Sequence, residues 1–490
     1  MTVAFVSMLA AIAVGHLVAS WIDPPASPFV AVNNWVRDLS PHPVTEWAKA
    51  TFGTYDKLVL FTGVAAVLLG ITALAGLISR RRATPGLVLT AVLGVVGFVA
   101  VLTRPDVGQL GIVAPAASMI VGFVAFRWLH ARAPFDTHTE RRTFLRGVVG
   151  TVIGAGVAGV VGQLVAGRVD VEASRRQVGK LVPTDPAPKL PANADFPGTA
   201  RFITSNRDFY RIDTALSLPR VAAQDWRLRI HGLVDREVEY TYDDIRDRGL
   251  IERPVTMACV SNDVGGGLIS TANFMGVPLR DLLRQAGIRS GADQVFSTSA
   301  DGFTAGSPVD VLLEESRGAM LAIGMNGEPL PIEHGFPARL VVPGLYGYVS
   351  ATKWVVDLEV TTFAAKQGYW MPRGWSALGP IKTQSRIDTP HDGDTVGRRT
   401  TVAGIAWAQT VGVDRVDVMV DGGEWQPAEL AAEVSLNTWR MWQITLDLDP
   451  GDHTIQVRAT DRDGYTQTSN PAPPAPDGAT GWHRVDVTAA

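Results

Sequence analysis

Cysteine is almost absent from this chain, because Cys259 is the single cysteine among 490 residues. One cysteine excludes an intramolecular disulfide and a structural zinc site made of several cysteines. A lone cysteine is more often a small buried apolar residue than a reactive one, so Cys259 needs support from its surroundings. The net charge is also small, −4 at pH 7, and gives no reason to expect nucleic acid as a partner.

Charged residues are nearly missing from five long apolar stretches in the first third of the chain. These stretches cover residues 2–22, 58–79, 85–103, 110–129 and 148–167. Each is close to the ~20 residues with which a helix crosses a bilayer. The sequence therefore predicts a five-helix transmembrane region over residues 1–167, with the lipid bilayer as a partner, followed by a water-soluble remainder.

Positive charge gathers at particular ends of these stretches. The arginines concerned are Arg80, Arg81 and Arg82 after the second stretch, and Arg127, Arg132, Arg141, Arg142 and Arg146 between the fourth and fifth. The positive-inside rule places both clusters in the cytoplasm. We therefore expect a multi-pass protein of the cytoplasmic membrane, with its N-terminus inside and everything after residue 168 on the outer face. The alternative for the first stretch is a cleaved signal peptide, although no lysine or arginine precedes it.

The second arginine cluster also resembles an export signal. Glu140-Arg141-Arg142-Thr143-Phe144-Leu145-Arg146 is similar to a twin-arginine signal. That pathway moves proteins that have already folded around a cofactor, so it predicts cofactor insertion in the cytoplasm before translocation. The alternative is a basic patch that only fixes the topology.

Two features of the apolar region raise the question of other cofactors. The glycines of residues 154–159 match G-x-G-x-x-G, which suggests a flavin or nicotinamide oxidoreductase as an alternative. That fingerprint needs a strand before it, a helix after it and an acidic residue about 20 positions later; glycines in an apolar stretch also serve helix packing in membranes. Haem needs two axial ligands, and His16, His42 and His130 do not form an evident pair.

The rest of the chain falls into three parts by pattern. Proline is frequent over residues 168–200, which predicts a linker lying along the surface of the next domain. Strand-like and helical patches alternate over residues 201–365 and indicate an α+β domain. Residues 366–490 contain strand patterns separated by turns such as Asp421-Gly422-Gly423, which are typical of an immunoglobulin-like sandwich.

The surroundings of Cys259 favour a role in binding. An apolar strand leads into it, and a polar loop with glycines at 265–267 follows. Glycines let the backbone approach a ligand closely, and a thiolate suits a soft or high-valent metal. Because one thiolate cannot hold a metal alone, an organic cofactor or residues elsewhere must complete the coordination.

Several motifs of this half resemble the sulfite oxidase-like molybdopterin-dependent oxidoreductases. They are C-V-S-N-D-V-G-G from Cys259, G-V-P-L from Gly276, H-G-F-P-A-R-L-V-V-P-G from His334, K-W from Lys353, and the sandwich residues Trp425, Trp439 and Trp442. The resemblance covers about residues 200–490 and implies a molybdopterin-binding domain over 201–365. It also implies an immunoglobulin-like dimerisation-type domain over 366–490, and hence a homodimer, in a membrane-anchored bacterial form.

The resemblance implies roles for individual residues. Cys259 would ligate molybdenum and act in catalysis, with the pterin dithiolene as the other sulfur source. The residues implied to bind the molybdenum-molybdopterin cofactor are Asn206, Phe209, Tyr210, Ser299, His334, Arg339, Ser350, Ala351, Thr352 and Lys353. A planar guanidinium and a lysine ammonium both suit a phosphate. Each residue also has an ordinary alternative, such as an ion pair between Arg339 and Glu333.

The function implied by the resemblance is two-electron redox chemistry, or oxygen-atom transfer, on a small substrate outside the cell membrane. Sulfoxide reduction and sulfite-type oxidation are both open, with a quinone-linked or haem protein as electron-transfer partner. One position departs from the true sulfite oxidases, in which arginines follow the loop asparagine. Here Asp263 follows Asn262, and a carboxylate disfavours an anionic substrate. A non-enzymatic cell-surface binding protein remains the third interpretation.

Overall fold

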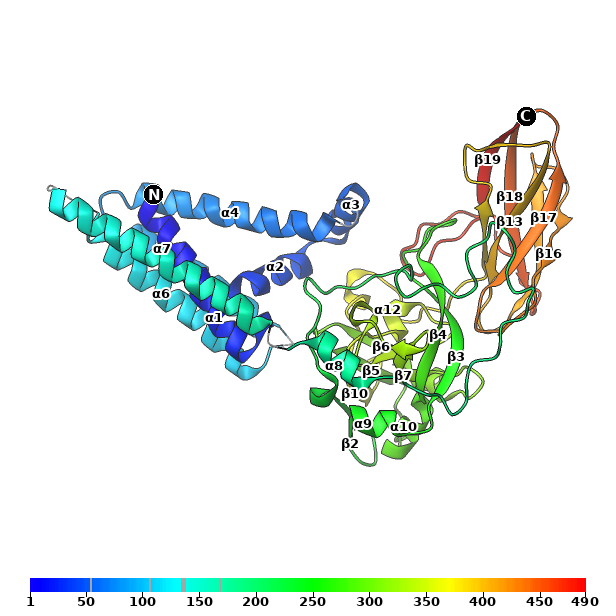
Figure 1. Ribbon diagram of the computed structural model, residues 1–490, viewed down its shortest axis with the longest axis horizontal. Helices are drawn as coiled ribbons and strands as arrows, with labels where there is room; N and C mark the ends of the chain where they lie inside the picture. The colour runs from blue at the N-terminus through cyan, green and yellow to red at the C-terminus, as the bar shows by residue number, and fades with distance from the viewer. Residues whose placement is uncertain (53–54, 105–106, 134–137, 168) are drawn as a thin grey trace. The chain divides into compact units, whose positions relative to one another are not determined.

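The computed structural model describes the chain except for residues 53–54, 105–106, 134–137 and 168. Residue 168, the expected start of the linker, therefore lies outside the described residues. The chain divides into two compact units, Met1–Asp170 and Val171–Ala490, and each is described by itself below (Figure 1).

The elements that the structure describes in the first unit are all helices. Its helices are α1 (Thr2–Ile22), α2 (Pro28–Leu39), α3 (His42–Phe52), α4 (Asp56–Ile78), α5 (Thr84–Leu102), α6 (Val113–His130) and α7 (His138–Ala166), with the 3-10 turns η1 (Pro24–Ala26) and η3 (Gln109–Ile112). Helix α1 packs against α6 and α7 (Figure 1). In the described part of the chain, five stretches are long and apolar enough to cross a membrane. They are α1, α4, α5, Gln109–His130 and the stretch that begins at Arg141 within α7.

Helix α7 differs from its prediction in where it begins. It starts at His138, ten residues before the expected 148, so Arg141 and Arg142 lie in its first turns. The glycines of residues 154–159 lie inside the same helix. The residues directly before them, 152–153, are helical and not a strand, so the nucleotide-binding interpretation of these glycines is wrong.

The second unit begins with an α+β domain that contains two sheets. The first sheet has the order β2 (Val238–Thr241), β1 (Arg227–Gly232), β10 (Val355–Thr361), β5 (Gln294–Ser299), β6 (Thr304–Pro308). The second has the order β3 (Ile251–Ala258), β4 (Ile269–Pro278), β7 (Met320–Met325), β8 (Glu328–Pro329), with β9 (Arg339–Val341) also on β7. The helical elements are η4 (Ala223–Asp225), α9 (Tyr242–Arg246), α10 (Leu279–Ala286), α11 (Val309–Leu313), η5 (Ile332–His334), α12 (Gly347–Ser350) and η6 (Met371–Arg373).

The core of this domain follows from its patterns of apolar residues. Strand β7 is buried along its whole length, as expected for a central strand covered on both faces. Helix α10 buries Leu279, Leu282, Leu283 and Ala286, which share one face at helical spacing. Strands β3 and β4 are antiparallel with Ala258 opposite Ile269. The residue after β3, Cys259, is thereby placed at the edge of a rigid core.

The C-terminal domain is a sandwich of two sheets. One has the order β11 (Gln384–Thr389), β13 (Arg399–Trp407), β17 (Arg440–Asp447), β16 (Glu429–Leu430). The other has the order β12 (Thr395–Val396), β19 (His483–Ala489), β18 (Gly451–Asp461), β14 (Val413–Val420), β15 (Gln426–Pro427). Buried and exposed residues alternate along β19, because one face of the strand packs on the opposite sheet.

The expected linker has more structure than its prolines predicted. It contains helix α8 (Val171–Val178), and Val171 and Leu181 belong to the core of the α+β domain. Farther along, the Thr184 N–H donates to the Leu250 carbonyl at 2.8 Å. The segment therefore lies along the domain, as expected, but it starts with a docked helix that the proline pattern did not indicate.

Candidate active site

Cys259 stands at the start of a tight loop. Its N–H donates to the Leu268 carbonyl at 2.9 Å, and its carbonyl accepts from the Asn262 N–H at 3.1 Å. The buried side chain of Asn262 closes the loop, because its Oδ1 accepts from the Leu268 N–H at 2.7 Å. Cys259 is buried, with 9% of its surface exposed.

The C-terminal sandwich holds the outer part of this loop. Gly265 has φ +78, and a Cβ at this position would collide with the His483 ring, so only glycine fits here. Arg386 donates to the Gly266 carbonyl at 2.8 Å. Burial, followed by the charge of Arg386, lowers the pKa of His483. Both domains of the second unit therefore shape the loop that carries Cys259.

Two tyrosines lie within electrostatic reach of the Cys259 sulfur. Burial raises the pKa of Tyr210 far above its usual range, and the charge of a Cys259 thiolate raises it further. Burial and, less strongly, Cys259 also raise the pKa of Tyr346 to about 12. Both phenols therefore stay protonated and can donate a hydrogen bond. Tyr210 was expected at the site, whereas Tyr346 was missed because it lies between matched motifs.

The segment around Asn206 joins Tyr210 to His334 through stacked rings. Phe209 stacks on Tyr210 with centroids 5.3 Å apart and meets the His334 ring edge-on at 5.4 Å. The Nε2 atom of His334 lies 2.8 Å from the Asn206 carbonyl; because a carbonyl only accepts, Nε2 carries the proton. Burial, together with the positive charges of Arg339 and Lys353, lowers the pKa of His334 to about 4. The imidazole is thus neutral at physiological pH.

Arg339 is a buried cation whose hydrogen-bond partners are all main-chain oxygens. Its guanidinium donates to the carbonyls of Leu340, His334 and Ala351 at 3.4, 3.2 and 3.4 Å. Burial lowers its pKa to about 10. None of the ion pairs found among the described residues involves Arg339. A buried charge without a counter-ion is costly, so this position fits an anionic group of a ligand.

Lys353 is a second buried cation, and a carboxylate compensates it. Its Nζ lies 3.0 Å from Asp213 Oδ2 and donates to the Glu333 carbonyl at 3.1 Å. Burial lowers the pKa of Lys353 to about 8, although Asp213 opposes this shift. Asp213 also pairs with Arg211 at 2.9 Å. Sequence reasoning missed Asp213, because a single aspartate outside any motif gives no signal.

The remaining expected residues lie in this region, but their hydroxyls bind protein atoms. Ser350 Oγ donates to the Tyr346 carbonyl at 3.0 Å. Thr352 Oγ1 lies 2.7 Å from Ser297 Oγ, and Ser299 Oγ accepts from the Asp301 N–H at 3.4 Å. These hydroxyls hold the loop and the adjoining turn in place. Ser297, which the sequence did not indicate, supports the 350–353 loop from β5.

Two family models match the second unit. Residues 215–370 match the oxidoreductase molybdopterin binding domain, and residues 377–490 match the Mo-co oxidoreductase dimerisation domain. Both ranges agree with the two domains described above. The uncompensated Arg339, the neutral His334 and the thiol at the loop's edge fit a phosphate-bearing pterin that carries a metal.

Individual proteins support the same relationship. The chain is 30% identical over 355 residues to mitochondrial sulfite oxidase of Macaca fascicularis, which covers 61% of this chain and 64% of that protein. It is 29% identical over 315 residues to inducible nitrate reductase [NADH] 2 of Glycine max, covering 51% and 35%. The chain thus spans less than two thirds of the length of these relatives.

Among solved structures, the chain is similar to the sulfane dehydrogenase SoxCD from Paracoccus pantotrophus. It is 26% identical, covers 55% of this chain and 75% of that chain, and has a TM-score of 0.48. The matched domains and the sulfite oxidase relatives confirm the expected family and its molybdenum-molybdopterin cofactor. The chain belongs to the sulfite oxidase-like molybdopterin oxidoreductases.

Proposed function

We propose that this protein is a membrane-anchored molybdopterin oxidoreductase that transfers an oxygen atom, in a two-electron reaction, to or from a small substrate. The observation that carries this proposal is that the Cys259 thiol and the uncompensated cation Arg339 both lie within electrostatic reach of the same residue, Tyr210. A thiol alone is no site, and neither is a lone buried arginine. Together they suit a ligand that brings a metal at one end and a phosphate at the other.

The residues of this chain would divide the work of binding. Cys259 would hold the metal as a thiolate, while His334, Arg339 and Lys353 would hold the pterin and its phosphate. When bound, the cofactor supplies the two-electron and oxygen-transfer chemistry. The protonated Tyr210 can donate a hydrogen bond near Cys259, and the loop hydroxyls keep the 350–353 segment rigid.

The charges around the loop favour a neutral substrate. Asp263 is exposed and lies in the loop that follows Cys259, directly after Asn262. The nearby Arg386 is paired with Asp388 at 2.6 Å, so the carboxylate partly neutralises its positive charge and less of it is available to attract an anion. A sulfoxide would avoid the repulsion that a sulfite dianion meets at Asp263. Sulfite oxidation is the second candidate, because sulfite oxidases are among the relatives.

The helical unit supports an anchor with one basic end. A Cβ on Gly76, near the end of α4, would lie 2.7 Å from the Met1 Cα, and His130 Nε2 at the end of α6 lies 2.6 Å from the Ser79 carbonyl. Phe144 of α7 packs in the same cluster as Val3. The arginines that follow α4 and begin α7 therefore gather at the end where α1 starts. The positive-inside rule puts that end in the cytoplasm and the second unit on the outer face.

The proposed partners follow from this arrangement. The dimerisation domain supports a homodimer, and two-electron chemistry requires a carrier for the electrons. We assign that role to a quinone-linked or haem protein that reaches the outer face.

The decisive experiment purifies the full chain in detergent from cells supplied with molybdate. Stoichiometric molybdenum with pterin, and turnover of sulfoxides with an artificial electron donor, are the expected results. Sulfite turnover with an artificial acceptor would select the second candidate. Bound flavin or nicotinamide without molybdenum would contradict the proposal, and the absence of any cofactor would favour a binding protein.

A further inference from the structure

Helix α8 lies outside both matched ranges, yet it is docked firmly on the cofactor domain. Val171 is 5% exposed and belongs to the main core. The Ser174 hydroxyl accepts from the Ala223 N–H at 2.9 Å and lies 3.0 Å from Gln224 Oε1. The helix is therefore fixed by apolar contact and by hydrogen bonds to η4, and not merely tethered beside the domain.

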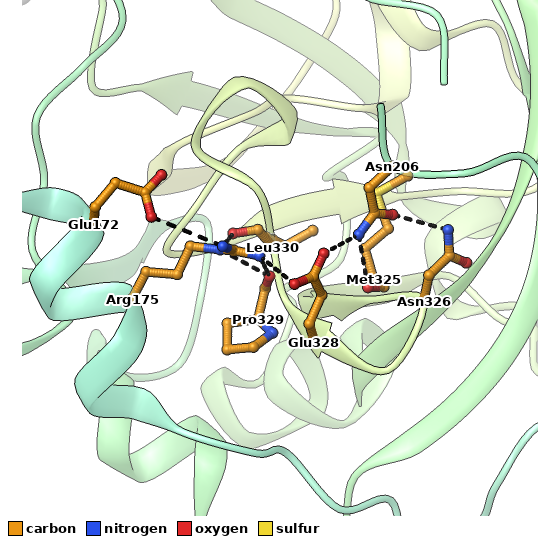
Figure 2. A network of polar contacts seen from close by, with 8 residues as sticks. All are labelled: Glu172, Arg175, Asn206, Met325, Asn326, Glu328, Pro329 and Leu330. Carbon is orange, nitrogen blue, oxygen red and sulfur yellow. Dashed lines mark hydrogen bonds and ion pairs between the residues drawn. The ribbon is translucent and has the colours of Figure 1, made fainter. Parts of the chain in front are cut away.

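Arg175 projects from α8 onto β8 and the residue that follows it (Figure 2). Its Nε donates to the Leu330 carbonyl and its Nη2 to the Pro329 carbonyl, both at 2.9 Å. The same Nη2 lies 2.9 Å from Glu328 Oε2. A guanidinium can satisfy these divergent acceptors at once because its donors form a rigid fork, whereas a lysine ammonium cannot.

Glu328 also contacts Asn206 and so links it to Arg175 (Figure 2). The second carboxylate oxygen of Glu328 accepts from Asn206 Nδ2. The other end of the amide, Oδ1, accepts from Asn326 Nδ2 at 2.8 Å. The Asn206 main-chain carbonyl in turn accepts from His334 Nε2. Asn206 is thus held at three points, and one of them sets which nitrogen of His334 carries the proton.

We propose that Arg175 is a positioning residue for the cofactor. It fixes Glu328 and the 328–330 segment, Glu328 fixes Asn206, and Asn206 fixes the orientation and tautomer of His334. The helix next to the membrane segment in the chain thereby helps to retain the pterin. This inference rests on the proposed placement of the pterin beside Asn206 and His334.

The test measures how fast the purified holoenzyme loses pterin and molybdenum during dialysis. Arg175→Ala should lose them about 10- to 100-fold faster than the unmodified protein, which is the usual effect of removing a residue that orients a ligand-binding group. Arg175→Lys keeps the charge without the fork and should fall between the two. Arg176→Ala, an exposed arginine of the same helix, is the matched control and should release the cofactor at the normal rate.

A purely structural role of α8 gives a different outcome. It would lower the unfolding midpoint of cofactor-free Arg175→Ala below that of Arg176→Ala and would leave the rate of cofactor loss unchanged. Positioning through Glu328 also predicts that Arg175→Ala with Glu328→Ala loses pterin no faster than the worse single variant. If the two single substitutions instead multiply each other's effect on the rate of pterin loss, Arg175 does not act through Glu328 and the proposal is overturned. If Arg175→Ala does not fold, Arg175→Lys and Glu328→Gln provide the same comparison.

Failure of this inference can be told apart from failure of the proposed function. Normal molybdopterin content in the unmodified chain, with equal loss rates from all variants, contradicts only the role of Arg175. An unmodified chain without pterin contradicts both.

Discussion

The two units treat charge in opposite ways. In the helical unit, Arg80, Arg81 and Arg82 directly follow Ser79 at the end of α4, where the Ser79 carbonyl meets His130 of α6. In the second unit, Arg339 is buried without a carboxylate partner among the described residues, whereas Lys353 is paired with Asp213. Charge at the ends of apolar helices indicates where the solvent begins. A buried charge without a protein counter-ion, such as that of Arg339, indicates an anionic ligand.

The strongest way to break this comparison is to remove the thiol that we propose as the metal ligand. Cys259→Ser should reduce turnover to the assay background, since serine supplies no thiolate, while the fold persists because the side chain is similar in size. Activity with an artificial electron donor or acceptor, together with circular dichroism, checks both parts. Activity equal to that of the unmodified protein would end the assignment of Cys259 as a ligand.

The next change separates the effect of the buried Arg339 charge on protein stability from its effect on cofactor binding. Arg339→Met should lower cofactor content about 10- to 100-fold and leave the cofactor-free protein as stable as before, or more stable by about 1–4 kcal/mol. Elemental analysis and chemical denaturation measure the two effects. The control is Arg458→Met, which breaks a pair with the buried Asp417 at 3.3 Å; it should cost stability and leave cofactor content unchanged. Loss of stability in cofactor-free Arg339→Met would show that the ligand is not what this arginine serves.

His334 offers a test by pH. Its pKa is about 4 in the folded chain against 6.5 as the ordinary value, so folding favours the neutral ring. Its stabilising effect is present in full above about pH 6.5 and is lost as pH falls toward 4, where the unfolded chain binds a proton that the folded chain does not. The difference amounts to about 3 kcal/mol. Urea unfolding of cofactor-free protein at pH 7 and pH 4 should show it, and His334→Gln should remove that part of the pH dependence.

The smallest expected effect concerns the basic end of the helical unit. Arg141→Lys combined with Arg142→Lys keeps the positive charge but removes the arginine pair. If the pair is an export signal, the amount of second unit accessible to protease outside the membrane should fall several-fold. If it only fixes topology, export should be normal. Substitution of Arg80 and Arg81 by lysine serves as a control of equal charge.

Much of this architecture was predictable from local patterns. Apolar length indicated α1, α4, α5 and α6 to within a few residues, and strand alternation with turns indicated the sandwich. Helix α8 was not predictable: its few apolar residues give no strong signal, and Val171 is buried only because the domain core is present to receive it. A pattern within eight residues cannot report a partner that lies far away in the chain.

The residues of the candidate site also fall into those that the sequence predicted and those that only the structure revealed. Motifs brought out Cys259, His334 and Arg339, whose order in the chain is specific. Asp213 and Tyr346 come from segments without motifs, and they are part of the site only because Lys353 and Cys259 lie near them in space. Spatial neighbours without a sequence pattern require the structure.

The contact between Gly265 and His483 has a consequence for engineering and for evolution. A chimaera that exchanges the sandwich for that of a relative would also exchange the wall against which the loop after Cys259 rests. Substitutions more than two hundred positions away along the chain, in the domain that matches the dimerisation model, can therefore change the shape of this loop.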